Sequence, residues 1–212
     1  NINKNFIKNL IKNSKLKIIL IAGTNGKTTT AKLIQTILER DNKKVFRNES
    51  GANLLNGIAS SLILNSNSFG KIDKDFAIFE IDENTLPLIL KEIPNPDFIL
   101  LLNLFRDQLD RYGEVNTIAD KWKKAIEQLA SPTRLDSAER AGGLSNKTIL
   151  VLNADDPQIA SLGNKQTYHI GEAIPIPYRK RSYDQVFYFG LECKKHSNKN
   201  LQHASDSTYC PN

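Results

Sequence analysis

The sequence predicts a P-loop-type α/β fold, a mostly parallel sheet with helices on both faces. Short apolar runs alternate with longer segments whose apolar residues recur at helical spacing, which is typical of strands joined by crossover helices. Each run is mostly apolar through its length, as strands covered on both faces are. A glycine-containing turn at Gly23–Thr30 also separates the first run from the first long helix, as in folds that bind phosphate there.

The expected elements follow from these patterns in chain order. The apolar, β-prone runs predict strands at Lys17–Ile21, Lys44–Arg47, Phe76–Ile81, Phe98–Leu102 and Thr148–Leu152. Helical periodicity predicts helices at 28–40, 53–64, 84–92, 115–130 and 156–162. Residues 131–147 are polar and lack periodicity, so we expect a surface loop there. An aromatic, β-prone run at 183–189 opens a polar C-terminal segment.

An amphipathic helix is expected ahead of the first strand, over residues 2–12. Its apolar face carries Ile2, Phe6, Ile7, Leu10 and Ile11, and a second stripe carries Lys4, Lys8 and Lys12. This helix either packs on the domain surface or rests on anionic lipid. We divide the chain into this helical region (1–16), a central domain (17–182) and a small C-terminal part (183–212).

Length and composition limit the function classes. The 212 residues are 40% apolar, enough for the core of one good-sized domain. The net charge of +6 suits anionic ligands such as nucleotides, and without interleaved aromatic and basic residues we expect no nucleic-acid partner. Two cysteines do not form a disulfide framework, so a cytoplasmic location is expected. No apolar stretch is long enough to span a membrane, and because the chain contains no Met we expect it to be part of a longer protein.

The turn at Gly23–Thr30 predicts a phosphate site. Its backbone N–H groups and the dipole of the following helix face an anion, Lys27 adds positive charge, and the Thr28 hydroxyl can hold Mg²⁺. The alternative is a plain strand-to-helix connection, which the Lys-Thr-Thr after Gly26 argues against. The expected nucleotide contacts from this turn are Gly23, Thr24, Asn25, Gly26, Lys27, Thr28 and Thr29.

Polar residues follow each of the expected strands, and in open α/β sheets ligands bind outside these carboxyl ends. Glu80 ends one strand, and with Thr28 it could hold Mg²⁺ through hard oxygens. Asn103 and Asn153 could recognise adenine, and Asp155 or Asp156 the ribose hydroxyls. Alternatives stay open: Glu80 as a solvated strand-end charge, 153–157 as a helix N-cap that can coexist with binding, and Asp107 with Asp110 as a surface pair.

Several motifs together resemble one family. Gly23–Thr30 and Asn153–Pro157 resemble the phosphate loop and the adenosine-side motif of the Mur ligases, and Glu80 falls where that family has its Mg²⁺-binding glutamate. Ser50–Gly57 and Leu104–Glu114 resemble the MurT-type ligase subunits of lipid II isoglutaminyl synthase. The resemblance covers roughly residues 15–165 and implies the Mur ligase central ATP-binding domain over 17–182.

The resemblance implies an ATP- and Mg²⁺-dependent carbon–nitrogen ligase of peptidoglycan synthesis. Its substrate would be the D-glutamate α-carboxyl of the lipid II stem peptide, activated as an acyl phosphate at the inner face of the membrane. Ammonia would come from a class-I glutamine amidotransferase partner of the GatD type. Lys27 and Glu80 would carry the catalytic roles, because the approach of a carboxylate to the γ-phosphate needs positive charge.

Two of the chain's departures from the family pattern bear on the assignment of site residues. Gln108 stands where many Mur ligases have His, and a neutral amide is a poorer metal ligand than imidazole. The family also has a C-terminal domain that closes over the nucleotide, and we expect no counterpart of it within these 212 residues. In MurT-type proteins that domain supplies a catalytic aspartate and the amidotransferase contact, so no residue here is assigned those roles.

A cysteine-bearing tail suggests a second metal. MurT-type proteins carry a zinc ribbon of two Cys-x-x-Cys knuckles near this position. Cys193, His196 and Cys210 could form part of such a site with Zn²⁺, and His203 is a possible substitute ligand. The alternative is a disordered, truncated tail.

Two other functions remain open. One is another Mur-like ligase that acts on folate or on free amino acids. Folate-type relatives usually show Gly-Lys-Gly-Ser where this chain has Gly-Lys-Thr-Thr at Gly26–Thr29, which argues against folate. The other is a non-catalytic nucleotide-binding fragment or regulatory subunit. This part of a protein is expected to be inactive on its own.

Overall fold

The computed structural model describes residues 6–12, 14–48, 51–105, 114–129, 148–163, 183–189, 202–203 and 208–209. The helices are α1 (Phe6–Lys12), α2 (Lys27–Arg40), α3 (Leu55–Leu64), α4 (Leu86–Glu92), α5 (Glu114–Leu129) and α6 (Pro157–Ser161). The strands are β1 (Lys17–Ala22), β2 (Val45–Arg47), β3 (Phe76–Ile81), β4 (Phe98–Leu101), β5 (Thr148–Asn153), β6 (Tyr183–Phe189), β7 (Gln202–His203) and β8 (Thr208–Tyr209). Strands β7 and β8 form a separate antiparallel pair.

A six-stranded sheet in the order β2-β3-β1-β4-β5-β6 forms the centre of the fold. Every neighbouring pair runs parallel, so the carboxyl ends of all six strands lie along one edge. The central strand β1 is buried from its second residue onward, which explains why its sequence is apolar without alternation.

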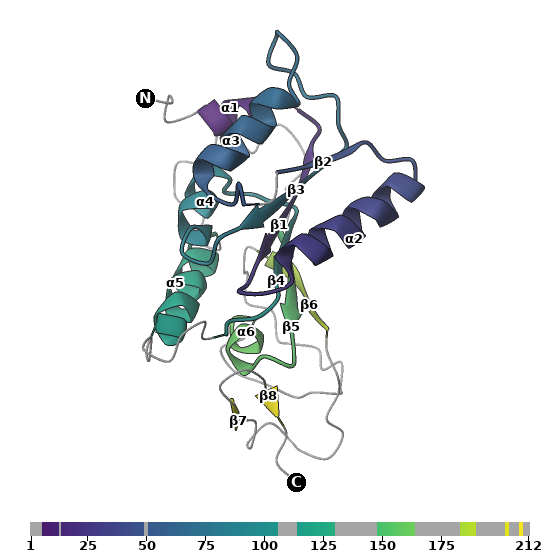
Figure 1. The fold of residues 1–212 in the computed structure, drawn as a ribbon. Helices are drawn as coiled ribbons and strands as arrows, with labels where there is room; N and C mark the ends of the chain where they lie inside the picture. The colour runs from purple at the N-terminus through teal and green to yellow at the C-terminus, as the bar shows by residue number, and fades with distance from the viewer. Residues whose placement is uncertain are drawn as a thin grey trace.

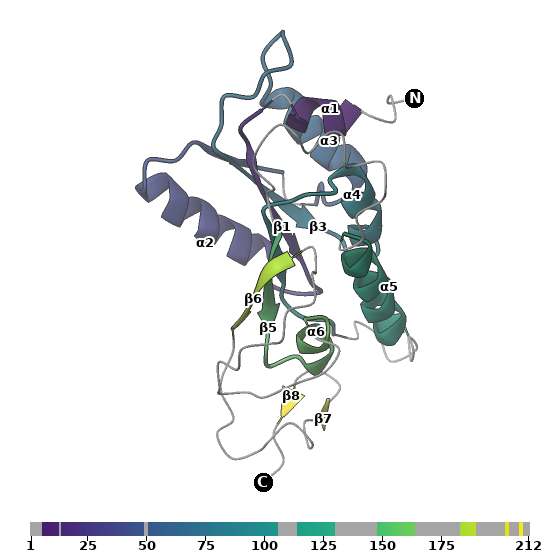
Figure 2. The same ribbon diagram turned by 180° about the vertical axis from the view of Figure 1, so that it is seen from behind.

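Helices cover both faces of this sheet, as predicted. Figures 1 and 2 show α2 on one face, with α1, α3, α4 and α5 on the opposite side. The larger core lies under those four helices and α6, and Trp122 of α5 is fully buried there. Phe46 and Phe79 meet within it edge to face, with ring centroids 6.0 Å apart. A smaller cluster, which includes Ile21, Ala31 and Ile78, joins α2 to the other face.

Between residues 17 and 162 the element boundaries differ from the predicted ones by one or two residues, apart from β3, which is confirmed over Phe76–Ile81. Helix α3 begins at Leu55 because Leu54 is extended and an intervening turn at 51–54 precedes it. The described part of the N-terminal helix packs Ile7 and Leu10 into the core, so its apolar face serves packing. In the part of the chain that the structure describes, no helix combines the length and apolar character that crossing a membrane requires.

Residues 183–189 lie elsewhere than expected. The sequence predicts this run to be part of the C-terminal segment, whereas in the structure it forms β6 and pairs with β5 at the edge of the main sheet. The sheet therefore extends past residue 182. Parallel pairing between distant segments leaves no turn signal in the sequence, so an isolated β-prone run does not disclose its neighbour. The surface loop expected at 131–147 lies outside the described residues.

Candidate active site

The loop between β1 and α2 lies against the end of β4. Gly23 has φ +151°, and a Cβ placed there would come within 3.0 Å of Leu102 Cβ and 3.1 Å of the Asn103 backbone. Gly26 has φ +85°, in the left-handed region that favours glycine, and forms the N-cap of α2. The two glycines therefore let the chain turn tightly from the strand into the helix, as the sequence predicted.

The N-terminus of α2 is left open for an anion. No side chain caps it and its first turn contains no acidic residue. The first N–H groups of a helix have no intrahelical partner, and the dipole makes this end positive. This geometry fits the phosphates of a nucleotide.

Lys27, at the start of α2, is held over the loop. Its ammonium group donates to the Gly23 carbonyl oxygen and, at 3.1 Å, to the Thr24 carbonyl oxygen. The Glu83 carboxylate lies 3.8 Å from the same nitrogen. The cation is thus already at the loop where the sequence reading placed it.

Thr28 and Glu80 come together across 52 residues of sequence. The Thr28 hydroxyl donates to Glu80 Oε2 at 2.6 Å, and Arg47 Nη1 donates to Glu80 Oε1 at 3.2 Å. Glu80 is buried, and its side chain is only 5% exposed. The hydroxyl and carboxylate oxygens are the hard ligands that Mg²⁺ prefers, so this pair fits the metal. Among the described residues, no three or more His, Cys, Asp or Glu side chains cluster in a way that could hold a metal ion.

Asn48 is a residue of the site that no sequence motif indicates. It is fully buried just after β2, and its side chain bonds both the N–H and the C=O of Glu80 at 2.9 Å. The same amide nitrogen donates to the Ala52 carbonyl oxygen at 2.7 Å. Asn48 therefore fixes the main chain from which the Glu80 carboxylate projects.

Asn103 is placed at the site but its amide is used by the loop. Its Oδ1 accepts the Asn25 N–H at 2.9 Å, and its Nδ2 donates to the Asn25 carbonyl oxygen at 3.1 Å. The Asn103 carbonyl oxygen also accepts the Thr24 N–H at 3.0 Å. In this structure the side chain holds the phosphate loop in place, a role different from the adenine contact we expected.

The capping interpretation of 153–157 is confirmed. Asp156 is 2% exposed; its Oδ1 accepts the first N–H groups of α6, at Gln158 and Ile159, and its Oδ2 accepts the Leu104 N–H at 2.9 Å. A carboxylate engaged this way has little capacity left for a ribose. Asn153 donates to the Leu102 carbonyl oxygen at 2.7 Å and accepts the Asp155 N–H at 3.0 Å, which leaves Asp155, half-buried, as the acid of the pair nearer solvent.

Some predicted residues cannot be placed. Asp107, Gln108, Asp110 and the zinc candidates Cys193, His196 and Cys210 lie outside the described residues, and only the backbone of His203 is described, in β7.

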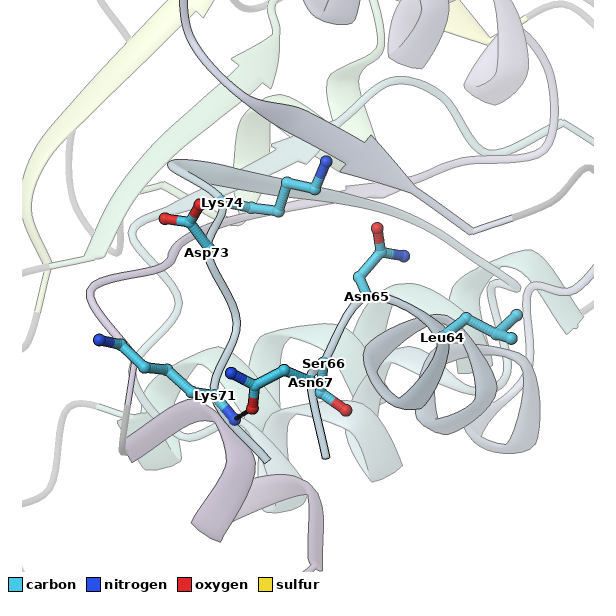
Figure 3. Close-up of a pocket in the computed structure, with 7 residues that line it drawn as sticks. All are labelled: Leu64, Asn65, Ser66, Asn67, Lys71, Asp73 and Lys74. Carbon is cyan, nitrogen blue, oxygen red and sulfur yellow. Dashed lines mark hydrogen bonds between the residues drawn. The ribbon is translucent and has the colours of Figure 1, made fainter. Parts of the chain in front are cut away.

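A surface hollow elsewhere on the molecule is separate from this site. Figure 3 shows it beside the C-terminal end of α3, lined by residues 64–67, Lys71, Asp73 and Lys74. Asp73 and Lys74 precede the first residue of β3, whereas Glu80 lies near its last. The hollow is therefore at the amino edge of the sheet, opposite the phosphate loop. At this amino edge too, burial raises the pKa of the Asp97 carboxyl, although the Ile18 N–H at 2.7 Å opposes the change.

Comparison with known proteins identifies a family match and several relatives of this chain. The family described as Mur ligase middle domain matches residues 21–205. Lipid II isoglutaminyl synthase (glutamine-hydrolyzing) subunit MurT of Staphylococcus aureus (strain COL) is 34% identical over 196 residues, which cover 92% of this chain and 36% of that protein. The subunit of the same name from Streptococcus pneumoniae (strain ATCC BAA-255 / R6) is 31% identical over 98% of this chain and 38% of its own length.

More distant relatives share the fold or part of the sequence. UDP-N-acetylmuramoylalanine–D-glutamate ligase of Wolbachia pipientis wMel is 31% identical over 78% of this chain and 26% of its own length. A crystal structure of MurF from Acinetobacter baumannii superposes with a TM-score of 0.53 at 17% identity, over 74% of this chain and 29% of that one. The chain thus spans little more than a third of the length of the MurT proteins it matches.

Proposed function

The chain belongs to the Mur ligase family, as a middle domain related to MurT, and from this premise we propose that it is the ATP-binding part of a ligase subunit that phosphorylates a carboxylate for amidation. The observation that carries the proposal is the Thr28–Glu80 pair, 2.6 Å apart beside the uncapped N-terminus of α2.

The chemistry of this edge suits transfer of a phosphoryl group to a carboxylate. A substrate carboxylate and the γ-phosphate repel each other, so the reaction needs fixed positive charge at the point where they meet. Lys27 and the N–H groups of α2 provide such charge and orient the triphosphate. Thr28 and Glu80 would hold Mg²⁺, which supplies charge neutralisation at the phosphate oxygens when it is bound.

For the substrate we propose the α-carboxyl of D-glutamate in the lipid II stem peptide. A carboxylate oxygen attacks the γ-phosphorus, the bond to the bridging oxygen of ADP breaks, and an acyl phosphate results. Ammonia then attacks the acyl carbon, phosphate leaves with the C–O bonding pair, and the nitrogen loses a proton to give D-isoglutamine. The similarity to MurT over 92% of the chain supports this substrate. On this proposal the reaction takes place in the cytoplasm, at the membrane face that carries lipid II.

The ammonia source we propose is a GatD-like glutamine amidotransferase bound to the longer protein. Support comes from the MurT relatives, which are named as subunits of a glutamine-hydrolyzing synthase.

A second candidate is another amide ligase of the family, favoured by the 31% identity to a D-glutamate-adding ligase. A non-catalytic nucleotide-binding piece is the third candidate. These candidates differ in what they do with ATP and lipid II.

The deciding experiment uses the longer natural protein, purified with and without its amidotransferase partner. The expected result is ATP- and glutamine-dependent amidation of lipid II, seen by mass spectrometry as conversion of the carboxyl to the amide. ADP release with free D-glutamate but not with lipid II would favour another Mur-like ligase. No ATP binding by calorimetry would favour the non-catalytic alternative.

A further inference from the structure

We propose that Arg47 is the stand-in cation of the metal site: it neutralises and orients Glu80 while Mg²⁺ is absent and yields that role when the metal binds. The proposal rests on the proposed function, because it takes Thr28 and Glu80 as the metal ligands. It concerns a residue that belongs to neither the phosphate loop nor the strand-end motifs.

The position of Arg47 follows from the sheet. Strand β2 ends at Arg47, whose backbone is in register with Ile78 of β3. Side chains alternate along a strand, so Glu80, two residues beyond Ile78, projects on the same face as Arg47. The guanidinium nitrogen therefore reaches Glu80 Oε1 at 3.2 Å. This face is the one that α2 covers, and Thr28 lies in the first turn of α2.

The two oxygens of the Glu80 carboxylate are divided between two partners. Arg47 holds Oε1, and Oε2 faces the Thr28 hydroxyl at 2.6 Å. Two adjacent ligands of an octahedral Mg²⁺ lie about 2.9 Å apart, because each metal–oxygen bond is about 2.1 Å long. Thr28 and Glu80 Oε2 are thus already close to the spacing the metal requires. With the Glu80 main chain fixed by Asn48 and Oε1 held by Arg47, the carboxylate has little freedom to turn away.

Arg47 and Mg²⁺ can each compensate the negative charge of the Glu80 carboxylate. A carboxylate as buried as Glu80 needs a compensating positive charge. Among the described residues, the ion pair recorded for Glu80 is the one with Arg47, whose side chain is 28% exposed. A divalent cation on Oε2 would supply that compensation and repel the guanidinium. Because the guanidinium is partly exposed, it can move toward water when this happens. Arg47 therefore stabilises the metal-free state more than the metal-bound state.

The role proposed for Arg47 predicts the direction in which its replacement changes the affinity for a divalent cation. An interaction that stabilises the metal-free protein more than the metal-bound protein weakens metal binding by the corresponding factor. Removing the charge of Arg47 should therefore tighten the binding of a divalent cation. The expected change is about twofold to fivefold, the range for a partly exposed ion pair. A residue that only held the fold together would change metal affinity in the opposite direction or leave it alone.

The test measures Mn²⁺ binding by electron paramagnetic resonance, in saturating ADP, for the wild type and for Arg47→Met, Arg47→Gln and Arg47→Lys. Both neutral variants should bind Mn²⁺ about twofold to fivefold more tightly, and Arg47→Lys should stay near the wild type. Arg47→Gln keeps a donor for Oε1, so it covers the case in which Arg47→Met does not fold. Equal or weaker Mn²⁺ binding in the folded neutral variants would overturn the proposal.

Glu80→Gln separates this proposal from the proposed function. If Glu80→Gln weakens Mn²⁺ binding in both the wild-type and the Arg47→Gln backgrounds, the metal assignment stands and the Arg47 result is decisive on its own. If Glu80→Gln leaves Mn²⁺ binding unchanged, the metal site assumed under the proposed function is wrong and the role of Arg47 falls with it. A thermal melt in EDTA and in Mg²⁺·ADP provides a second readout: the rise in Tm should be larger for Arg47→Gln than for the wild type.

Discussion

Asn48 pairs with Glu80 as the next residue of a neighbouring strand would. Its amide oxygen accepts the Glu80 N–H and its amide nitrogen donates to the Glu80 C=O, each at 2.9 Å. Strand β2 ends one residue earlier, so a side chain continues the ladder where the backbone leaves it. The same amide nitrogen reaches the Ala52 carbonyl oxygen, which links the turn before α3 to the metal-site glutamate.

Replacing Asn48 with Ala should destabilise the protein and the site together. The N–H and C=O of Glu80 would be left buried without these partners, which should lower the free energy of unfolding by about 2–3 kcal/mol. Urea denaturation measures the loss, and Mn²⁺ titration of the folded fraction should show weaker binding. Asn9→Ala, at an exposed position on α1, is the control and should change neither quantity. A fully stable Asn48→Ala protein would contradict this account.

Gly57 should tolerate no larger residue, although it lies in the first turn of α3 and away from the phosphate loop. A Cβ there would meet the Ala52 carbonyl oxygen at 2.2 Å, and that oxygen is the one Asn48 bonds. Gly57→Ala should therefore cost about 1–3 kcal/mol through overpacking, against the usual gain from Ala in a helix. Thermal unfolding compares it with Ser60→Ala, an exposed position on the same helix, which should be neutral or slightly stabilising. An unchanged Tm for Gly57→Ala would show that the turn moves freely.

Lys27→Ala should weaken ATP binding by about tenfold to a hundredfold, the value of one hydrogen bond to a charged group. Two carbonyl oxygens already hold the ammonium group at the loop, so the Lys27 side chain does not have to be reoriented when ATP binds. Calorimetry with Mg²⁺·ATP measures the change. Lys32→Ala, exposed on the same helix, removes an equal charge and should have little effect. Similar losses of ATP affinity in the two variants would show that the overall positive charge matters and that Lys27 makes no specific contact.

Asp97 should give the stability a pH-dependent component. Burial raises the pKa of its carboxyl above 3.8, so the folded state holds the proton more firmly than the unfolded chain does. The resulting stabilisation is complete below a pH of about 4 and is lost as the pH rises through the raised pKa. The free energy of unfolding of the wild type minus that of Asp97→Asn should therefore be largest in acid and smaller at neutral pH. Urea denaturation over a pH series tests this, with the exposed Asp41→Asn as control. A difference that is constant with pH would exclude the effect.

The sheet could be predicted because its strands are buried on both faces. Apolar runs such as Ile18–Ile21 leave few other structures, and the helices between them require parallel pairing. The ends were less certain: α3 starts at Leu55 because Leu54 is extended, and no Gly or Pro marks that point in the sequence. The position of β6 could not be inferred, because its partner β5 is distant in sequence.

Some residues of the candidate site could be predicted from the sequence and others could not. Lys27, Thr28 and Glu80 follow from a local motif and from the rule that ligands bind at the carboxyl ends of strands. Arg47 and Asn48 lie next to the site only through the pairing of β2 with β3, and Asn48 is 32 residues from the glutamate it holds. Asn103 and Asp156 were found, but the structure shows their polar atoms engaged by the protein itself.

The buried Trp122 gives this protein a built-in optical reporter. It is the single tryptophan of the chain, and its indole N–H donates to the Glu83 carbonyl oxygen at 2.7 Å. Glu83 follows Glu80 closely and its carboxylate faces Lys27, so the fluorophore is joined to the phosphate end of the sheet by one hydrogen bond. Within this chain its emission does not overlap that of another indole, so we expect it to follow ligand binding in real time without a dye or an engineered label.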